Sequence, residues 1–290
     1  MISVVVPAHN EAAVIGRLLT RLLADAAPGE LDVLVVANGC TDGTERVAAA
    51  YGPGVRVLST PDANKFRAMR LADTAAENFP RFYVDADVEL DTGSVRNLAA
   101  ALAQPGVLAV APERAWPVPG APWTVSWYLD VWHRLPAARA GLFGRGVVGL
   151  SEEGFKRLRD LPEVMGDDLA ASLAFTRAEQ RVVADATVVV HPPRSLRNLV
   201  RIRERALVST EQLARAGTFA QAGAEARTSR ADLAAVVRRD PLRFAPKAVL
   251  FVFVTLWVRR RARRRLESGD FRTWQRDDSS RTTDGAGTAS

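Results

Sequence analysis

Cysteine is almost absent from this chain of 290 residues, since Cys40 is the only one. A single cysteine excludes a disulfide within the chain and agrees with a reducing compartment such as the cytosol. Long hydrophobic runs are lacking too, because the longest, Ala248–Val258, is well short of the ~20 residues that a membrane-spanning helix needs. The run Ile2–Val6 is too short for a signal peptide and lacks a basic leader. We therefore expect a chain that does not cross the bilayer.

Lysine is scarce as well, with Lys65, Lys156 and Lys247 the only three. The net charge of +6 therefore comes from arginine, and six arginines crowd into residues 259–265. Such a block suits an anionic surface: lipid headgroups, nucleic acid or a phosphorylated substrate. The hydrophobic fraction of 48% and the charged fraction of 25% are ordinary for a globular protein with a substantial core.

Strands and helices alternate in the first part of the chain. Short apolar runs predict buried strands at Ile2–Val6, Leu31–Val36, Val55–Leu58 and Arg81–Val84. Helical patterns lie between them, at Ala12–Leu23 and about Lys65–Ala76. This order predicts a parallel sheet covered by helices on both faces. Ligands of such sheets bind outside the carboxyl ends of the strands, where residues 7–11, 37–39 and 85–87 are polar.

The middle of the chain has a different pattern. Four prolines, Pro112, Pro117, Pro119 and Pro122, predict a loop over residues 112–123. A helix is expected at Ser151–Arg159, and from Ser195 to about residue 266 the pattern is helical and increasingly basic.

Two aspartates follow the fourth predicted strand. Because alternate residues of an extended segment point the same way, Asp85 and Asp87 would face the strand-end crevice together. Two like charges this close are costly without a cation, and Mg²⁺ or Mn²⁺, which bind oxygen ligands and phosphates, are the natural partners. The alternative is a loop in which both aspartates are solvated or cap a helix. Their place at the end of an apolar strand favours the metal.

A second acidic pair, Asp167 and Asp168, opens a predicted helix at Leu169–Phe175. Such residues stabilise a helix N-terminus without any catalytic role. A carboxylate can also act as the general base that takes the proton of an acceptor hydroxyl. Both interpretations stay open on the residues alone.

Arginines recur at intervals of three and four residues near the end of this region, at Arg194, Arg197, Arg201 and Arg205. On a helix they would share one face. Guanidinium groups bind phosphate in a bidentate manner, so Arg197 or Arg201 would hold a diphosphate or a phosphorylated acceptor, with Lys65 a further candidate. A solvated helix face is the alternative.

Five motifs occur in a fixed order over about residues 1–210. They are Val4 to Glu11, Asn38 to Thr44, Asp85-Ala86-Asp87, Gly166-Asp167-Asp168-Leu169, and the helix bearing Arg197 and Arg201. Each motif alone is weak, but the ordered series is specific. It resembles the series found in family 2 glycosyltransferases.

The resemblance implies a GT-A fold, which is an α/β architecture with a mainly parallel central sheet flanked by helices. It also implies a nucleoside-diphosphate sugar donor whose base and ribose are held by Ala8, Glu11 and Asn38. Family members more often have aspartate in place of Asn38, so the donor base stays open. Asp85 would contact the ribose or the metal shell, and Asp87 would coordinate Mn²⁺ or Mg²⁺.

The resemblance also assigns roles to later residues. His191, which follows a predicted strand at Thr187–Val190, would be a metal ligand, and a locally bonded histidine is the alternative. Asp168 would be the general base, oriented by Asp167, and Arg197 and Arg201 would hold phosphate. The expected reaction is a hexosyl transfer to a hydroxyl acceptor by direct displacement, with inversion implied by the family alone.

We expect three parts: the glycosyltransferase catalytic domain at 1–210, a helical basic extension at 211–268 and a disordered polar tail at 269–290. The apolar segment Phe244–Val258, followed by the arginine block, predicts a helix that lies at anionic headgroups. A helix packed on the catalytic domain is the alternative. The expected location is the cytoplasm, at the inner face of the cell membrane, where a lipid-linked acceptor or a cell-envelope glycan precursor would be used. Nucleic acid is not an expected partner.

Three other classes compete with this interpretation. A dinucleotide-binding oxidoreductase would need a glycine-rich first loop, and residues 7–11 contain no glycine. A nucleotidyltransferase of related architecture would need a glycine-rich basic loop there. An inactive membrane-associated scaffold that still binds nucleotide stays open, although the intact Asp85, Asp87 and Asp168 argue against it.

Overall fold

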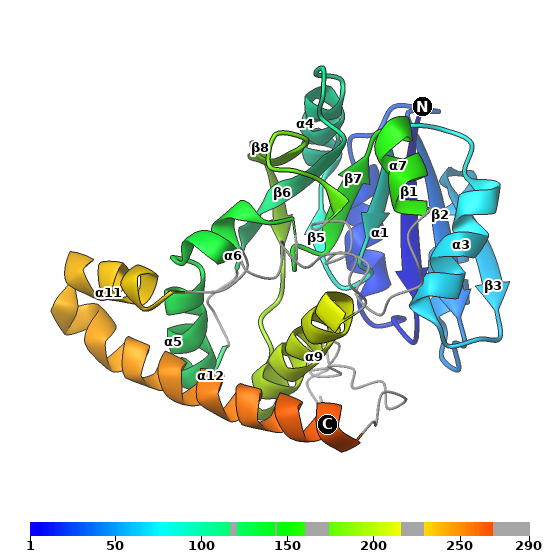
Figure 1. Ribbon diagram of the computed structural model, residues 1–290. Helices are drawn as coiled ribbons and strands as arrows, with labels where there is room; N and C mark the ends of the chain where they lie inside the picture. Colours follow the sequence, from blue (N-terminus) through cyan, green and yellow to red (C-terminus); the bar gives the residue numbers. More distant parts are fainter. Residues whose placement is uncertain (117–120, 143, 160–173, 216–228, 269–290) are drawn as a thin grey trace, which may run out of the picture. The chain divides into compact units, whose positions relative to one another are not determined.

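The structure is a computed structural model that describes residues 1–116, 121–142, 144–159, 174–215 and 229–268. The chain forms two compact units (Figure 1). Unit 1 comprises Met1–Trp116 and Leu142–His191, and unit 2 comprises the described parts of Pro117–Gly141 and Pro192–Ser280. Asp167, Asp168, nearly all of the predicted helix that follows them and the predicted tail lie outside the described residues.

Unit 1 is built on one sheet, in which the described strands follow the order β3-β2-β1-β4-β7-β6-β8-β5. The strands are β1 (Ile2–Ala8), β2 (Leu31–Asn38), β3 (Val55–Thr60), β4 (Arg81–Val84), β5 (Glu89–Leu90), β6 (Ala109–Ala115), β7 (Val147–Leu150) and β8 (Gln180–Val189). Strands β3, β2, β1 and β4 are parallel, as are β6 and β8, whereas β7 runs antiparallel to both of its neighbours and β5 is antiparallel to β8. The expected α/β architecture with a mainly parallel sheet is confirmed.

The helices of unit 1 are α1 (Ile15–Leu23), α2 (Thr44–Ala49), α3 (Lys65–Ala75), α4 (Thr92–Leu102) and α7 (Glu152–Arg159), with a short 3-10 turn at Gly52–Gly54. Unit 2 is helical, with α5 (Trp123–Trp132), α6 (Pro136–Ala140), α9 (Leu196–Arg215), α11 (Arg230–Arg239) and α12 (Pro241–Ser268). The domain boundary placed at residue 210 falls inside α9, and the assignment of 1–210 as the catalytic domain stays a prediction.

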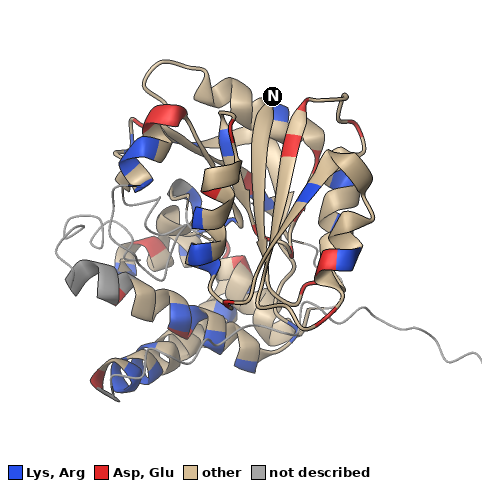
Figure 2. Ribbon diagram, turned by 90° about the vertical axis from the view of Figure 1, so that its right-hand side faces the viewer, with Lys and Arg blue, Asp and Glu red and all other residues tan. Residues whose placement is uncertain are grey.

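Successive residues of β1 point to opposite faces of the sheet, and each face is covered by a different helix. Because both faces are buried, the sequence of β1 is continuously apolar. On one face Val4 and Val6 pack with Leu18 of α1. On the other face Val5 packs with Ala68 of α3. The sheet is therefore covered on both faces (Figure 1), and Figure 2 shows that its strands carry few charged residues.

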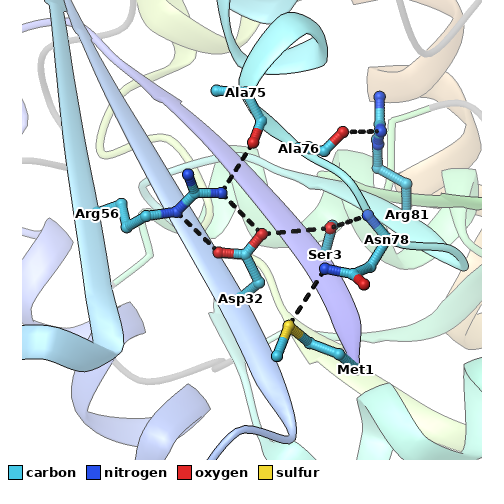
Figure 3. Close-up of polar contacts among 8 residues, drawn as sticks. All are labelled: Met1, Ser3, Asp32, Arg56, Ala75, Ala76, Asn78 and Arg81. Carbon is cyan, nitrogen blue, oxygen red and sulfur yellow. Dashed lines mark hydrogen bonds and ion pairs between the residues drawn. The ribbon is translucent and has the colours of Figure 1, made fainter.

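Polar contacts hold the amino ends of the first three strands (Figure 3). Asp32 of β2 accepts hydrogen bonds of 3.0 and 2.9 Å from the guanidinium group of Arg56 in β3. Arg56 also donates to the carbonyl of Ala75 at the end of α3, and Ser3 of β1 donates to Asp32. The charges of Asp32 and Arg56 at this edge are therefore paired with each other. The opposite edge, at the carboxyl ends of the strands, carries the predicted ligand-binding residues.

The predicted loop at residues 112–123 is wrong for its first residues, because β6 continues through Pro112 to Ala115. The register of β6 against β8 shifts between Pro112 and Glu113. Proline has no N–H to donate to a neighbouring strand, and a bulge of this kind is a place where the sheet tolerates it.

Helix α12 is much longer than the apolar run that predicted it. Over Pro241–Glu267 it is long and apolar enough to cross a membrane, with a mean hydropathy of 1.5 in an 18-residue window that is 22% buried. The runs Ala248–Val258 and Phe244–Val258, which are too short to span a bilayer, are thus parts of a longer helix, and the argument from their length is wrong. A core helix of a soluble protein meets the same criterion, so length and composition alone decide nothing here.

Candidate active site

The loops after β1 and β2 are hydrogen-bonded to each other at the carboxyl edge of the sheet. The Asn38 side chain donates to the Ala8 carbonyl at 2.8 Å, and the Glu11 backbone N–H donates to Thr44 Oγ1 at 2.8 Å. Both Asn38 and Glu11 are buried, with 3% and 5% of their surface exposed. The structure therefore brings together the three residues predicted to hold the donor base and ribose.

Asp42, which the sequence analysis did not single out, fixes the geometry of the second loop. Its carboxylate accepts hydrogen bonds from the Thr44 N–H (2.9 Å), the Thr44 hydroxyl (2.5 Å) and the Ala12 N–H (3.1 Å). Burial acts to raise the pKa of Asp42, but these hydrogen bonds outweigh it and the pKa is lowered. Aspartate favours such a turn because its side chain can accept a hydrogen bond from the backbone N–H two residues further on.

Gly39 lets the second loop pass close to the segment that follows β3. Its φ of 56° is in the left-handed region, and its N–H donates to the Thr60 carbonyl at 2.8 Å. A Cβ at this position would lie 2.8 Å from both the backbone nitrogen and the Cβ of Ala63. A side chain at residue 39 would therefore overlap atoms that cannot move independently of the backbone.

Gly39→Ala is expected to lower the free energy of unfolding by more than the roughly 1–2 kcal/mol that the left-handed conformation alone costs a residue with a Cβ. The matched control is Gly29→Ala. Gly29 has a φ of 74°, but among the residues that the structure describes no atom lies within 4 Å of the place where a Cβ would be. Urea denaturation of both variants measures the difference. Equal losses would show that the close approach to Ala63 carries no cost.

The acidic motif lies in a turn after β4. The Asp85 N–H donates to the Gly146 carbonyl at 2.8 Å, and the Val88 N–H donates to the Asp85 carbonyl at 3.4 Å. The expectation of an extended segment over Asp85–Asp87 is therefore wrong. Ala86 is nevertheless buried in the core, whereas Asp85 and Asp87 are only half-buried, so both aspartates lie outside the core.

Lys65 contributes a cation directly beside this motif. Its Nζ lies 2.9 Å from Asp85 Oδ1, and the two side chains are 31% and 41% exposed. Lys65 is the first residue of α3, whose N-terminus is capped by the Asn64 side chain. The structure thus places a predicted phosphate ligand next to a predicted metal ligand.

The fit of a divalent metal can be tested on these side chains. No group of three histidine, cysteine, aspartate or glutamate residues is close enough to hold a metal within the part of the chain that the structure describes. Mg²⁺ and similar ions are usually bound through one or two carboxylates, and substrate phosphates and water complete their coordination. The turn carries two carboxylates, Asp85 and Asp87, which is as many as a metal that arrives with a diphosphate needs from the protein.

His191 lies two residues beyond the end of β8 and is bonded to Glu89 of β5. Its Nε2 is 2.7 Å from Glu89 Oε1, and Arg17 and Arg21 of α1 approach the same carboxylate at 3.3 and 2.7 Å. Burial acts to raise the pKa of Glu89, but the bonds from Arg21 and His191 and the charge of Arg17 lower it. The structure therefore shows the locally bonded histidine, and the metal role stays a prediction. Glu89 was not predicted.

Arg197 and Arg201 lie on α9 of unit 2. Arg197 is exposed and Arg201 is half-buried, while Leu199 and Val200 between them are buried, as the helical spacing predicts. The role of both arginines toward phosphate stays a prediction. So does the role of Asp167 and Asp168, which lie outside the described residues.

Comparisons with known proteins decide the family. Residues 3–136 match the sequence profile described as glycosyl transferase family 2. An uncharacterized glycosyltransferase of Mycobacterium tuberculosis (strain H37Rv) is 32% identical over 165 residues, which cover 51% of this chain and 72% of that protein. The chain belongs to the family 2 glycosyltransferases. It is therefore an enzyme that transfers a sugar.

Solved structures support the fold of this glycosyltransferase. A mannosyltransferase of Pyrobaculum calidifontis, in complex with GDP-Man and Mn²⁺, matches 94% of this chain and 76% of its own with a TM-score of 0.57 and 21% identity. Glucosyl-3-phosphoglycerate synthase of Mycobacterium tuberculosis, in complex with phosphoglyceric acid, matches 72% and 78% with a TM-score of 0.55 and 22% identity. The glycosyltransferase has the GT-A fold that its sequence predicts.

Proposed function

We propose that this glycosyltransferase moves a sugar from a nucleoside-diphosphate sugar to a hydroxyl acceptor and depends on a divalent metal. The observation that carries the proposal is made at the carboxyl edge of the sheet. The buried residues Glu11 and Asn38 lie at this edge, and so does the ion pair between Lys65 and Asp85. A structurally similar enzyme was solved with GDP-Man and Mn²⁺, which supports the same class of donor and metal.

The first two loops would hold the nucleoside. Asn38 donates to the Ala8 carbonyl and the Glu11 N–H donates to Thr44, so hydrogen bonds between the two loops hold this part of the site together. Ala8, Glu11 and Asn38 are the residues proposed to contact the base and ribose. The amide of Asn38 can donate as well as accept hydrogen bonds, so the proposal leaves the base unspecified.

The diphosphate and the metal would lie at the turn after β4. Asp87 is the proposed metal ligand, and Asp85 is proposed to contact the ribose or the metal shell. His191 is the further metal ligand proposed from the sequence, and it would have to move toward this turn, because no three such side chains among the described residues are close enough to share a metal. Mn²⁺ or Mg²⁺ bound there would neutralise the charge that develops on the leaving diphosphate. Lys65, 2.9 Å from Asp85, supplies a fixed positive charge for the same phosphates. Arg197 and Arg201 are the further proposed phosphate ligands.

Asp168 is the proposed general base, and Asp167 is proposed to orient it. Its carboxylate would accept the proton of the acceptor hydroxyl while that oxygen attacks the anomeric carbon of the sugar. We propose an inverting transfer by direct displacement, in which the hydroxyl attacks from the side opposite the diphosphate; the inversion is proposed from the family resemblance alone.

The experiment that tests this function is the release of a nucleoside diphosphate from nucleotide sugars in the presence of Mn²⁺. A nucleotidyltransferase would instead release pyrophosphate from a nucleoside triphosphate and a sugar phosphate. A scaffold that only binds nucleotide would release neither product. The assay therefore separates the proposed function from both alternatives.

We further propose that the glycosyltransferase attaches to the cytoplasmic face of an anionic membrane through α12. One side of this helix packs within unit 2: Phe251 stacks on Tyr128 of α5 at 4.8 Å between ring centres, and Arg261 donates to Glu204 of α9 at 2.7 Å. The apolar side chains on its outer side are exposed, namely Leu242, Val249, Val252, Phe253, Leu256 and Trp257.

The arginine block continues this exposed side. Arg259, Arg260, Arg263 and Arg264 are exposed in the structure. A helix that presents apolar groups beside a block of arginines suits the boundary of an anionic bilayer. Such attachment would keep the active site near a lipid-linked acceptor or a cell-envelope glycan precursor, which are the acceptors proposed here.

The double variant Arg263→Gln/Arg264→Gln is expected to weaken binding to anionic liposomes by roughly 30-fold, at about 1 kcal/mol for each arginine. Phe253→Ser is expected to weaken binding to neutral and anionic liposomes alike. Arg238→Gln/Arg239→Gln on α11 is the matched control and should bind as the wild type does. Sedimentation at low and high salt measures all three. Equal binding of the wild type to neutral and anionic liposomes would contradict the electrostatic part, and no binding would contradict attachment.

A further inference from the structure

Arg203 of α9 lies on aromatic rings of α5. Its guanidinium carbon is 3.7 Å from the ring centre of Trp132 and 5.4 Å from that of Tyr128. The Tyr128 ring is itself stacked on Phe251 of α12, with 4.8 Å between the ring centres. Aromatic faces attract a guanidinium group and stack with its plane. These helices of unit 2 therefore hold the Arg203 side chain in one place.

The guanidinium group of Arg203 has no acidic partner among the residues that the structure describes. None of them forms an ion pair with it or accepts a hydrogen bond from it. Glu204, the next residue, is bonded to Arg261 at 2.7 Å, and Asp130 of α5 is paired with two other cations. Burial lowers the pKa of Arg203, and Tyr128 acts in the opposite direction. A bound anion would offset the cost of burying this charge.

Tyr128 adds a hydroxyl group to this place. The residue is only 4% exposed, yet no residue in the described ranges forms a hydrogen bond with its hydroxyl. A tyrosine this buried usually bonds its hydroxyl group to a partner. Neither Tyr128 nor Arg203 has a fully enclosed polar atom without a partner, so the polar atoms of both side chains reach solvent. A ligand from solution can therefore meet a guanidinium group and a hydroxyl group on neighbouring side chains.

The chemistry of the two side chains suits a phosphate group. The guanidinium fork matches two oxygens of a phosphate, and hydrogen bonds between charged groups are about twice as strong as neutral ones. A carboxylate has only the two oxygens that the fork takes, whereas a phosphate keeps others for the hydroxyl of Tyr128. Because the rings already hold the guanidinium group of Arg203, little side-chain freedom is lost when an anion binds.

We propose that Arg203 and Tyr128 form a phosphate-binding site in unit 2, which takes the phosphate of a phosphorylated small molecule or of a lipid headgroup. This site is separate from the arginine face predicted from the sequence, because Arg203 is two residues, or about 200° of helical rotation, from Arg201. It uses neither the metal nor the nucleotide donor. Such a site gives the enzyme a way to hold a phosphorylated acceptor by a group that takes no part in the sugar transfer.

The first test is a calorimetric titration with glycerol 3-phosphate, without nucleotide or metal. Arg203→Lys keeps the positive charge but loses the planar fork, so it should weaken binding roughly tenfold or more. Tyr128→Phe keeps the ring that stacks on Phe251 and should weaken binding roughly fivefold through the lost hydroxyl. Arg243→Gln is the matched control, because Arg243 also lies over an aromatic ring, 5.4 Å from the centre of Phe244, but is exposed. It should bind as the wild type does.

The second test is flotation with phosphatidylcholine vesicles that contain phosphatidic acid, whose headgroup is a phosphate. Arg203→Lys has the net charge of the wild type, so any attraction of α12 to an anionic surface is the same in both. Loss of affinity for glycerol 3-phosphate in this variant would identify a soluble phosphorylated ligand. Loss confined to the vesicles would identify a lipid headgroup.

The site is wrong if the wild type binds neither probe, or if Arg203→Lys binds both as the wild type does. A loss in Arg243→Gln as large as that in Arg203→Lys would also overturn it, since it would show a general effect of charge. Circular dichroism confirms that each variant is folded, and Tyr128→Phe decides the outcome if Arg203→Lys does not fold. Because both tests omit donor and metal, their failure leaves the proposed transferase function untouched.

Discussion

Asp87→Ala is expected to abolish turnover and to remove the thermal stabilisation that a nucleotide sugar gives in the presence of Mn²⁺. The variant loses the carboxylate proposed to hold the metal, and without the metal the negative charge on the leaving diphosphate is uncompensated. The fold should persist, because Asp87 is half-buried in a turn beyond β4 and Ala86 is the residue of the motif that packs in the core. Assays of activity and melting temperature measure both effects.

Asp62→Ala is the matched control for Asp87→Ala. Asp62 is also an aspartate in a loop after a sheet strand, and it pairs with Arg67 at 2.5 Å, but it is not a proposed ligand. Its replacement should leave donor-dependent stabilisation unchanged. Excess EDTA should reproduce the Asp87→Ala result on the wild type. Full turnover of the wild type in EDTA would show that the metal assignment is wrong.

Asp168→Asn is expected to reduce turnover by roughly 10²–10⁴ while donor affinity is retained. Asparagine keeps the shape of aspartate and most of its hydrogen bonds but cannot take the acceptor proton. The comparison of the two numbers is informative, because a change that disturbed the donor site itself would lower donor affinity as well. Initial rates and donor titration by calorimetry provide the two numbers.

Asp167→Asn is the natural comparison for Asp168→Asn, since the two residues are adjacent and have the same charge. It should reduce turnover less. A larger effect at residue 167 would make Asp167 the base. Retained activity in both variants would leave the pair as helix-capping residues with no part in the chemistry.

The first half of the fold is predictable from the sequence because its strands are buried on both faces. Such strands appear as continuous apolar runs, and the predicted runs at Ile2–Val6, Leu31–Val36 and Arg81–Val84 fall inside β1, β2 and β4. Helix α3 also begins at the predicted residue, Lys65. Since parallel strands end at one edge of the sheet, the association of Asn38 with Ala8 follows from the order of elements alone.

The remaining parts depend on contacts that no local pattern shows. The pairing of β5 with β8 joins residues about a hundred positions apart, so the contact between Glu89 and His191 could not be predicted. The turn at Asp85–Asp87 was missed for a related reason, because its geometry depends on a hydrogen bond to Gly146 from another segment. Pro112 was assigned to a loop on local preference, whereas a bulge accommodates it in β6.

The most direct measurement is the release of nucleoside diphosphate by the wild-type protein from a panel of UDP- and GDP-sugars. It is made with Mn²⁺ and again with excess EDTA, with and without candidate hydroxyl acceptors. We expect release from at least one nucleotide sugar, stimulated by an acceptor and abolished by EDTA. Release that continues undiminished in EDTA, or no release from any nucleotide sugar by a folded protein, would contradict a metal-dependent transferase.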